Sequence, residues 1–390
     1  MRKLRILIVC PYDNGTIGKC SLNLWKAIET VPDVEVQCIV KHHFPNGYPE
    51  FSGCEVYSNL PPKGGIGNLT SMGSQINWLR KQKKHFSPDI TISTLFSCSA
   101  LNVLAGGKDT KTGIFHSPHY QAKAHGRFAY AFTLFYYKFL FPHLDRLFCV
   151  SNEVKRSIVE SFPEIDPKKV SVVYNAHDIE DIHRKGSEAI EDSKEEEIFT
   201  HPILVYVGRF DRNKAPERAL RAFSALPADN DAHLAYIGGG NEDYQKELEE
   251  EATRLGISDR VHFLGHKSNP YKYLSKAQAL VSSSFSEGLP GVIIEALALG
   301  TPTIATNSSE GIWEILSCDK DYDRNLKENY VASAGIITPN SGDYDHDIKC
   351  LNKAMYLTLT TDSKTRIDDR FIEKVSFANV AKHYISTCEK

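Results

Sequence analysis

The chain has 390 residues, a length that accommodates two domains of ordinary size. Its composition, 41% hydrophobic and 24% charged, is typical of a globular protein, and no apolar run approaches the roughly 20 residues of a membrane-spanning helix. Residues 1–178 contain 21 Lys or Arg and 14 Asp or Glu, whereas residues 179–390 contain 25 and 35. We therefore expect different partners for the two halves, and a sequence pI of about 6.6 argues against a nucleic-acid-binding protein.

The first residues, MRKLRILIVC, combine a basic start with a short apolar run that no small-residue cleavage site follows. This pattern predicts an opening β-strand and not a signal peptide. Nine cysteines are scattered along the chain without a C-x-x-C pair, which argues against a disulfide framework or a zinc site. We expect a cytoplasmic protein, with the inner face of the membrane as one place of action.

The first half of the chain alternates β-branched runs with helical stretches. Strands are predicted at residues 4–10, 34–40, 89–95, 112–117, 146–151 and 170–175, and helices near residues 19–31, 71–86, 120–142 and 153–162. This alternation is typical of a parallel sheet covered by helices. We therefore predict a Rossmann-like domain over residues 1–180.

Residues 181–200 are polar, charged and aperiodic, and we predict a domain linker there. The alternation resumes with strands predicted at residues 202–208, 232–238, 260–265, 279–284 and 302–306, which indicates a second Rossmann-like domain over residues 201–367. Residues 368–390 have apolar side chains at helical spacing, and we expect a helix that packs back on the first domain. The predicted fold is α/β, with two doubly wound domains that face a cleft.

One segment of the second domain, SEGLPGVIIEALALG, carries two glutamates eight residues apart. Glu287 precedes a helix predicted over residues 290–299, and Glu295 lies inside it, in an otherwise apolar run. The backbone N–H groups at the start of that helix form an anion site that the helix dipole strengthens. These groups lie near Gly288, Leu289, Gly291 and Val292. A phosphate bound there would place Glu287 beside an attached sugar, with Glu295 near hydroxyls at the other end of the ligand.

Cations follow the first strand of the second domain, in the segment GRFDRNK. Arg209 directly follows the strand and Lys214 precedes the next helix. Both lie at the carboxyl end of a parallel strand, where α/β sheets bind ligands. Fixed cations and a helix N-terminus can neutralise a departing diphosphate without a metal. The glycine turn that includes Gly239 allows close approach to a ligand, and the strand that includes Phe263 offers edge backbone groups to a base.

The loop after the first strand, CPYDNGTIGKC, contains Gly15 and Gly18, which allow a tight turn. It is not a G-x-G-x-x-G motif, and Lys41 stands where an acidic residue would follow the second strand, which argues against a dinucleotide-dependent dehydrogenase. His116 ends a strand in the segment GIFHSPHY. An imidazole at a strand terminus is a candidate site group, and a hydrogen-bonded structural histidine is the alternative.

The segments GRFDRNK, IGGG, RVHFLGHKSNPYKYL and SEGLPGVIIEALALGTPTIAT resemble the retaining glycosyltransferases of family 4, also called group 1, which have the GT-B fold. The resemblance is strong over residues 200–317 and weak over the first half. It implies that Glu287 contacts the donor sugar and Glu295 the nucleotide ribose. It also implies that Arg209 and Lys214 bind the donor diphosphate.

In the first domain the same resemblance aligns Gly15 and Thr16 with a glycine pair of the family. The backbone N–H of Thr16 could then contact the donor, although the second glycine of the pair is missing. The family places a histidine beside the donor sugar, and the resemblance assigns that role to His116 and not to His119.

Two stretches of the first domain are rich in basic or aromatic residues. Residues 78–86 place Arg80, Lys81, Lys83 and Lys84 together, and residues 125–144 are crowded with aromatic side chains. In one interpretation the first stretch is a solvated face and the second a core helix. In the other, the two form a common surface for an anionic membrane or a lipid-diphosphate acceptor.

Two acidic clusters, DKDYD at residues 319–323 and DYDHD at residues 343–347, invite a metal assignment. The first lacks the glycine and the glutamate that a calcium-binding loop requires at fixed positions. We expect both clusters to be solvated loops, and we expect no metal and no cofactor.

The sequence therefore predicts a retaining glycosyltransferase of surface polysaccharide biosynthesis, such as that of lipopolysaccharide or capsule. The expected donor is a UDP-sugar, for example a UDP-N-acetylhexosamine, and the expected acceptor is a glycan or a polyprenyl-diphosphate-linked sugar. A non-hydrolysing nucleotide-sugar 2-epimerase and an inactive sugar-nucleotide sensor are the alternatives. The spacing of Glu287 and Glu295 argues against the first, and the intact set of site residues argues against the second.

Overall fold

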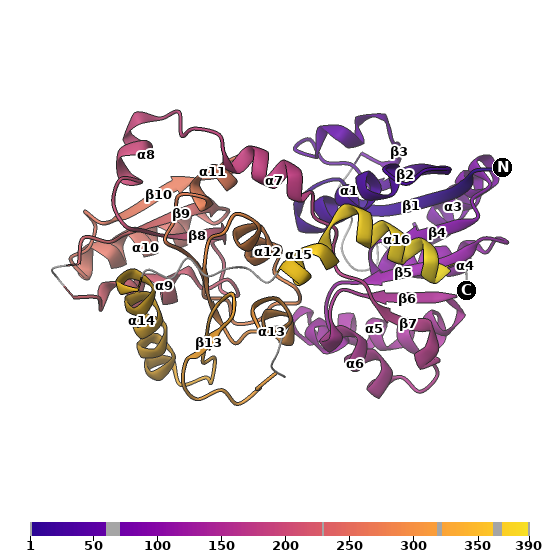
Figure 1. The fold of residues 1–390 in the computed structure, drawn as a ribbon. Coiled ribbons are helices and arrows are strands. Elements are labelled where there is room, and N and C mark those ends of the chain that lie inside the picture. Colours follow the sequence, from indigo (N-terminus) through magenta and orange to yellow (C-terminus); the bar gives the residue numbers. More distant parts are fainter. Residues whose placement is uncertain (1, 60–70, 228–229, 318–321, 362–368, 389–390) are drawn as a thin grey trace. The chain divides into compact units, whose positions relative to one another are not determined.

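The computed structural model describes residues 2–59, 71–227, 230–317, 322–361 and 369–388. The chain forms two compact units (Figure 1). Unit 1 consists of Met1–Asp178 and Glu373–Lys390, and unit 2 of Ile179–Ile372. Each unit contains a mainly parallel sheet with helices beside it, which confirms the predicted class of two Rossmann-like α/β domains.

The described residues of unit 1 form a seven-stranded parallel sheet in the order β3-β2-β1-β4-β5-β6-β7. Its strands are β1 Leu4–Tyr12, β2 Val34–His42, β3 Glu55–Ser58, β4 Ile90–Ser93, β5 Thr110–Phe115, β6 Arg146–Cys149 and β7 Val170–Val172. The strand order reverses between β1 and β4, because β2 and β3 lie on one side of β1 and β4 pairs with the other. In open α/β sheets ligands bind near such a reversal, beyond the carboxyl ends of the strands.

The helices of unit 1 are α1 Gly15–Glu29, α3 Met72–Phe86, α4 Phe96–Ala105, α5 Arg127–Phe139, α6 Asn152–Ser161 and α16 Phe377–Cys388, with 3₁₀ turns at Pro49–Gly53, His119–His125, Phe141–His143 and Pro167–Lys169. Helix α1 contacts β1 and β2 and buries an apolar face that includes Leu22, Leu24 and Ile28. Strand β3 and helix α4 are absent from the sequence prediction. Strand β3 is short and has no fully buried residue to signal it.

The end of the chain returns to unit 1, where α16 lies against α1 (Figure 1). The ring of Tyr384 packs edge-on against Phe148 of β6 at 4.5 Å, and Arg146 donates a hydrogen bond to the carbonyl of Thr387 at 3.0 Å. The single helix predicted for residues 368–390 is instead two helices, α15 Asp369–Val375 and α16. They are separated at Ser376, which forms a β-bridge with His177.

In unit 2 the described residues form a second seven-stranded sheet, in the order β10-β9-β8-β11-β12-β14-β13. Its strands are β8 Ile203–Arg209, β9 His233–Gly239, β10 Val261–Gly265, β11 Ala279–Ser282, β12 Thr303–Thr306, β13 Tyr330–Ala332 and β14 Gly335–Thr338, and only β13 runs antiparallel to its neighbour. Its helices are α7 Ile179–Gly186, α8 Ser193–Ile198, α9 Pro216–Ser224, α10 Glu242–Arg254, α11 Tyr271–Leu274, α12 Gly291–Ala298, α13 Glu310–Leu316 and α14 Tyr344–Thr360.

The prediction of an aperiodic linker at residues 181–200 is wrong, because helices α7 and α8 occupy much of it and belong to unit 2. Their residues have partners in that unit. Glu195 of α8 accepts hydrogen bonds from Lys267 at 2.5 Å and from Tyr273 at 2.6 Å, and the carbonyl of Lys185 in α7 accepts one from Asn269 at 3.0 Å. The charge of residues 181–200 predicts a solvated linker, but these residues are part of unit 2.

The acidic cluster at residues 343–347 is likewise not a solvated loop. Asp343 caps the N-terminus of α14 and accepts from the backbone N–H of His346. Asp347 is 2% exposed and forms an ion pair with the buried Arg218 at 3.3 Å. Part of the other cluster, residues 319–321, lies outside the described residues.

Helix α5 is not the core helix that its aromatic residues suggest. Phe128, Phe132, Phe135 and Phe139 are 45% to 86% exposed, and their spacing of four, three and four residues places them along one face of the helix. The buried residues of α5 are Thr133 and Tyr137. The helix therefore presents an aromatic face to solvent, which we call the α5 aromatic face.

The basic stretch at residues 78–86 does not form one solvated face of four cations. Lys83 is 7% exposed, and its ammonium group binds Asp109 at 2.8 Å and Asn102 at 2.6 Å. Arg80 donates to the carbonyl groups of two residues at the end of α4. The exposed cations Lys81 and Lys84 remain for contact with an anionic partner.

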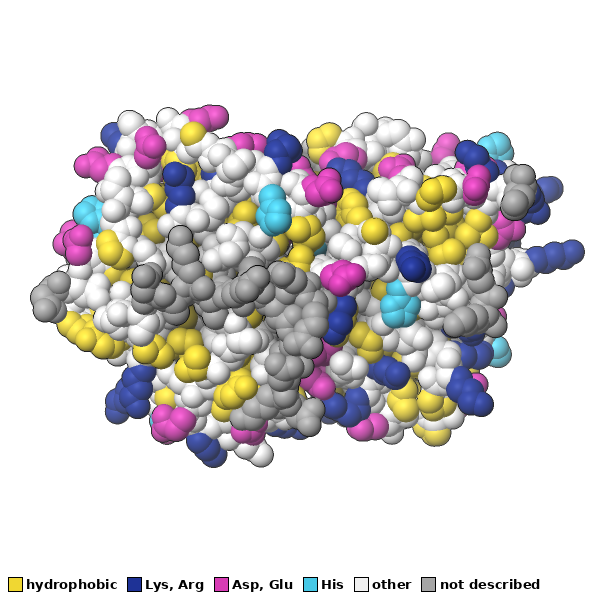
Figure 2. Space-filling model, in the orientation of Figure 1, with side chains coloured by type: hydrophobic (Ala, Val, Ile, Leu, Met, Phe, Trp, Pro, Cys, Tyr) yellow, Lys and Arg dark blue, Asp and Glu magenta, His cyan; other side chains and the backbone are white. Residues whose placement is uncertain are grey.

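Figure 2 shows positive and negative side chains over the visible face, with hydrophobic side chains in small groups among them. This mixture agrees with a net charge of only −3. Among the residues that the structure describes, every helix is too short or too polar to cross a lipid bilayer.

Candidate functional site

The predicted cations lie where β8 and β11 run side by side and the strand order of unit 2 reverses. Arg209 is the last residue of β8, and its side chain is 75% exposed, 3.1 Å from the carboxylate of Asp211. The other oxygen of Asp211 accepts the backbone N–H groups of Asn213 at 3.0 Å and Lys214 at 2.9 Å. This turn fixes the chain just before α9, so Lys214 is held at the carboxyl edge of the sheet.

Lys214 and Glu287 form the centre of the candidate site. The ammonium group of Lys214 donates to Oε1 of Glu287 at 2.6 Å, and the hydroxyl of Ser284 donates to the same oxygen at 2.6 Å. The side chains of Lys214 and Glu287 are 25% and 11% exposed. Asn213 joins the two loops, because its side chain donates to the carbonyl of Ser286 at 2.9 Å. The arrangement holds a carboxylate acceptor and a cation side by side.

Helix α12 begins at Gly291 directly after this loop, and the N–H groups of Gly291 and Val292 have no acceptor within the helix, whereas that of Ile293 donates to the carbonyl of Pro290 at 3.2 Å. Leu289 is 8% exposed, so its side chain packs inside and only its backbone can meet a ligand. Gly288 lies close to α13, since a Cβ atom on Gly311 would come within 2.2 Å of the Gly288 carbonyl oxygen. Val292 is half-buried on the first turn of α12.

Glu295 lies one turn further along α12 and is half-buried. Its Oε1 accepts a hydrogen bond at 3.0 Å from the hydroxyl of Tyr271, in α11. The tyrosine accounts for a glutamate in an apolar stretch, because a partly buried carboxylate needs a donor. The two glutamates therefore have separate partners, one a cation and a serine, the other a tyrosine.

The glycine turn after β9 lies beside the end of β8, where Gly239 pairs with Arg209. Gly238 has φ of 143°, and a Cβ atom there would lie 1.8 Å from the carbonyl oxygen of Gly208, so glycine is required. A Cβ atom on Gly239 would meet nothing within 4 Å, which leaves space beside this residue, although its carbonyl already accepts the N–H of Phe210 at 2.9 Å. Phe263 stacks on Tyr236 at 5.0 Å, so its half-buried ring packs against the core.

In unit 1 the predicted glycine loop leads from β1 into α1. Gly15 has φ of 63° and begins the helix, and Thr16 is exposed on its first turn. Gly18 permits a close approach, because a Cβ atom there would lie 2.9 Å from the backbone of Asp13. The N–H groups of this first turn lie at the carboxyl edge of β1, next to the strand-order reversal.

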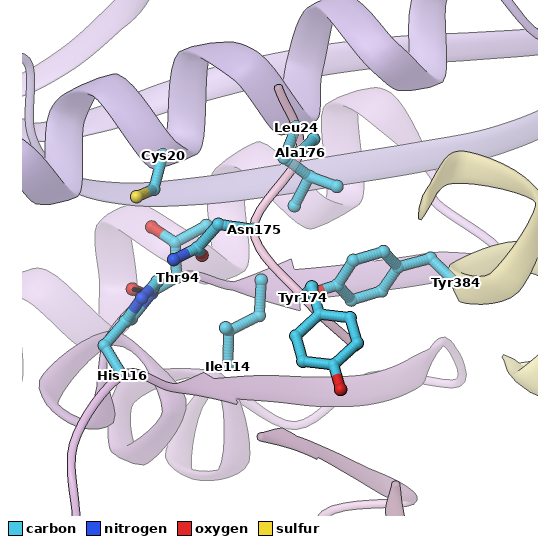
Figure 3. Close-up of a pocket in the computed structure, with 9 residues that line it drawn as sticks. All are labelled: Cys20, Leu24, Thr94, Ile114, His116, Tyr174, Asn175, Ala176 and Tyr384. Atoms are coloured by element: carbon cyan, nitrogen blue, oxygen red, sulfur yellow. Dashed lines mark hydrogen bonds between the residues drawn. The ribbon is translucent and has the colours of Figure 1, made fainter. Parts of the chain in front are cut away.

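His116 follows β5 at the same edge and lines a small cavity of about 10 Å³, the room of one water molecule (Figure 3). Its Nε2 donates to the carbonyl of Thr94 at 3.1 Å, which leaves Nδ1 as the acceptor of a neutral ring. Burial lowers the pKa of His116 to about 4, against the opposing effect of the Thr94 carbonyl. Figure 3 shows Cys20 from α1 and Tyr384 from α16 around the same cavity. His119 instead packs among aromatic rings, including that of Phe162 at 4.9 Å.

Within unit 2 the structure brings Lys214 and Glu287 into contact and places Arg209 and Gly239 on neighbouring strands. The sequence prediction lacks two residues of this neighbourhood, Ser284 and Tyr271. Ser284 ends the predicted strand 279–284, so its position at a strand terminus was a usable signal. Tyr271 had no such signal, because its partner Glu295 lies in a different segment of the chain.

Family models match both halves of the chain. Residues 172–334 match the model described as glycosyl transferases group 1, and residues 33–181 match the model described as glycosyltransferase family 4. The first match contains every site residue predicted in unit 2, and the second contains His116.

Curated relatives are also named as glycosyltransferases. An uncharacterized glycosyltransferase of Methanocaldococcus jannaschii is 27% identical over 52% of this chain and 49% of its own length. An N-acetylgalactosaminyltransferase of Campylobacter jejuni, named for a diphospho-undecaprenol-linked acceptor, is 32% identical over 46% of each chain. A lipopolysaccharide 1,6-galactosyltransferase of Salmonella typhimurium is 24% identical over 68% of this chain and 70% of its own. The chain spans about half the length of the first two relatives.

Solved structures share the fold over nearly the whole chain. Anabaena HepE, crystallised with UDP and glucose, superposes with a TM-score of 0.74 at 15% identity and covers 99% of this chain and 100% of its own. A sucrose-phosphate synthase from Thermosynechococcus elongatus gives a TM-score of 0.74 at 16% identity and 98% coverage of both chains. These likenesses show the GT-B fold. Both halves of the chain are therefore similar to glycosyltransferases, and residues 172–334 match the model of group 1 of these enzymes.

Proposed function

We propose that this protein transfers a sugar, with retention of anomeric configuration, from a UDP-sugar to a hydroxyl group of a glycan or lipid-linked acceptor. The observation that carries the proposal is the contact of Lys214 with Glu287 directly before the N-terminus of α12. A cation, a carboxylate acceptor and free helix N–H groups are the three kinds of group that a sugar diphosphate needs.

Each part of the donor has a matching group in unit 2. The diphosphate binds the first turn of α12 together with Arg209 and Lys214, whose charges oppose its own. Glu287 accepts hydrogen bonds from hydroxyls of the transferred sugar. Glu295, oriented by Tyr271, accepts those of the ribose. The empty space beside Gly239 permits close approach of the ligand.

The reaction follows from this placement of charge. The bond between the anomeric carbon and the diphosphate breaks, its electron pair passes to the leaving oxygen, and Arg209 and Lys214 stabilise the charge that develops there. The acceptor oxygen attacks from the same face and gives its proton to the departing phosphate oxygen, so configuration is retained. His116 enters as a neutral imidazole that hydrogen-bonds the sugar. Because side-chain cations neutralise the diphosphate, we expect transfer without a metal.

The relatives support the choice of donor and acceptor. Anabaena HepE was crystallised with UDP and glucose, and the Campylobacter relative is named as a transferase to a diphospho-undecaprenol-linked sugar. We extend both features to this chain, with an N-acetylhexosamine as one candidate sugar, and place its action in surface polysaccharide synthesis on the cytoplasmic side of the membrane.

The α5 aromatic face provides a way to reach such an acceptor. Four phenylalanines on one side of a helix bury apolar area in a membrane surface, and the exposed Arg127 and Lys138 beside them favour anionic lipid. We propose that this helix lies in the interface of the membrane that holds the acceptor.

The test of transfer measures nucleotide release from a panel of UDP-, GDP- and ADP-sugars, with and without a pool of lipid-linked acceptors, in the presence of EDTA. We expect acceptor-dependent release from a UDP-sugar, reduced about 10²-fold or more in Glu287→Ala. The matched control is Glu250→Ala, an exposed glutamate of α10, which should keep wild-type rates.

The outcomes separate the alternatives. Conversion of a donor to its epimer without acceptor would replace transfer by epimerisation, and nucleotide binding without any turnover would support a sensor. Equal rates in Glu287→Ala and Glu250→Ala would refute the assignment of the site.

Membrane contact has its own test. Co-sedimentation with vesicles rich in anionic lipid should fall at least tenfold in Phe132→Ser/Phe135→Ser. The matched control, Leu255→Ser/Val331→Ser, removes two exposed apolar side chains of unit 2 and should sediment like wild type. Equal sedimentation of both variants would refute contact through α5.

A further inference from the structure

A row of three histidines and one aspartate lies at the edge of unit 2 opposite the candidate site. His201 precedes β8, Asp231 and His233 belong to the segment that enters β9, and His262 is the second residue of β10. All four therefore lie at the amino ends of three neighbouring strands, whereas Arg209 lies at a carboxyl end.

The side chains of this row are in close contact. The imidazole rings of His201 and His233 stack at 4.2 Å with an angle of 9°, and those of His233 and His262 stack at 5.0 Å with an angle of 13°. Nδ1 of His201 lies 3.0 Å from the carboxylate of Asp231, and Nδ1 of His233 lies 2.7 Å from Nε2 of His262. One donor atom each from His201, Asp231 and His233 fits within a span of 4.8 Å.

The sheet explains this proximity. Parallel strands lie about 4.8 Å apart, so side chains at equivalent positions of neighbouring strands are forced together. Ile203 of β8 is in register with His233 of β9, which brings the residues just before β8 beside the start of β9. The backbone thus holds the histidines together, although stacked imidazoles gain little from each other in the absence of a ligand.

We propose that His201, Asp231 and His233 bind one divalent transition-metal ion, with Zn²⁺ as the favoured ion. Two imidazole nitrogens and one carboxylate oxygen are a ligand set suited to zinc, and water would complete a tetrahedral shell. His262 is the outer partner, because its hydrogen bond to Nδ1 of His233 fixes the orientation of that ring. Cysteine spacing gave no hint of this site, since none of its ligands is a cysteine.

The site has room to admit an ion from solvent. The side chain of Asp231 is 75% exposed and that of His201 is 36% exposed. A bound ion joins the segments that enter β8 and β9 and so adds a cross-link to unit 2. Because the ligands lie at the opposite edge of the sheet from Lys214 and Glu287, the ion takes no part in sugar transfer, and the proposal is independent of that function.

The test uses the full-length protein after treatment with EDTA and removal of the chelator. Equilibrium dialysis against micromolar free Zn²⁺ should show a bound zinc ion in wild type. His201→Ala and His233→Ala should each bind zinc at least tenfold more weakly. His262→Gln should weaken binding less than either, because it removes an outer partner. The matched control is His85→Ala, an exposed histidine of α3 in unit 1, which should bind like wild type.

A second measurement distinguishes loss of the zinc site from a folding defect in the variants. Zn²⁺ should raise the melting temperature of wild type and of His85→Ala, and it should not raise that of Asp231→Asn, which changes only an exposed side chain. Mg²⁺ should not substitute, because it prefers oxygen ligands. Equal zinc binding in wild type, His201→Ala and His233→Ala would overturn the proposal, as would an equal thermal shift in Asp231→Asn.

Discussion

The buried ion pair of unit 2 gives a sharp prediction, because it connects the core to the candidate site. Arg218 and Asp347 are 1% and 2% exposed and lie 3.3 Å apart. Arg218 also donates to the carbonyl of Ser283 at 3.2 Å and to the side chain of Asn340 at 3.0 Å, and Asn340 in turn donates to the carbonyl of Phe285. The pair therefore braces the chain that leads from β11 into the loop of the candidate site.

The perturbation is Asp347→Asn, which keeps the size of the side chain and removes its charge. Burial lowers the pKa of Arg218 and the carboxylate of Asp347 opposes that effect, so the variant leaves a buried guanidinium without its counter-charge. Breaking a buried pair in this way costs about 3–5 kcal/mol. At about 2–4 °C per kcal/mol for a domain of this size, the melting temperature should fall by roughly 6–20 °C.

Differential scanning calorimetry checks this magnitude against a surface pair of similar chemistry. Arg212 and Glu247 lie 3.2 Å apart with side chains 77% and 57% exposed, so Glu247→Gln should cost under about 1 kcal/mol. The double variant Arg218→Met/Asp347→Leu replaces both charges by apolar groups and should recover most of the lost stability. Equal melting temperatures in Asp347→Asn and Glu247→Gln would refute the argument from burial.

Three further predictions concern the candidate site residues. Tyr271→Phe removes the 3.0 Å hydrogen bond to Glu295, so the donor KM should rise about fivefold at unchanged kcat, which initial rates over donor concentration will test. Gly311→Ala places a methyl group 2.2 Å from a backbone carbonyl of the site loop, so kcat/KM should fall at least tenfold while circular dichroism stays that of wild type. His116 has a pKa of about 4 in the folded chain and 6.5 as an ordinary histidine, so the unfolded state binds more protons and stability falls as pH drops from 6.5 to 4. His116→Asn should reduce this loss of stability, by up to about 3 kcal/mol of unfolding free energy, which melting temperatures measured across this pH range will show. Melting temperatures that fall in parallel in wild type and the variant would contradict the lowered pKa of His116.

Local patterns sufficed for the elements whose signal lies within a few residues. The apolar runs of β1, β8 and β9 form strands that are buried over most of their central residues, and their limits agree with the prediction to within two residues. Helix α12 also agrees, since Gly300, with φ of 75°, follows its end as a glycine should. For the same reason the two glutamates and the strand-end cations could be selected as candidates from the sequence alone.

Features that depend on a distant partner could not be predicted in this way. Asp347 looks like one of several acidic residues in a polar run, and only Arg218, 129 residues earlier, makes it a buried group. The charged sequence around Glu195 predicts a solvated side chain, because its partners Lys267 and Tyr273 are distant in sequence. Helix α5 fails in the opposite sense, because its phenylalanines satisfy every local criterion of a core helix and yet no element of unit 1 covers them in the described chain.

The order of the strands explains both why the candidate site could be anticipated and why its contacts could not. Lys214 and Glu287 are 73 residues apart in sequence, and they meet because β8 and β11 are neighbours at the reversal of the strand order. Sequence placed each residue after a strand and hence at the carboxyl edge, where α/β sheets bind ligands. The sequence does not show which strands are adjacent, because the strand order depends on the crossover connections between the strands. At the amino edge, the pairing of β8 with its other neighbour, β9, brings His201 beside His233. One strand order thus builds a polar cluster at each edge of the sheet, and only the cluster at the carboxyl edge follows a pattern that sequence rules describe.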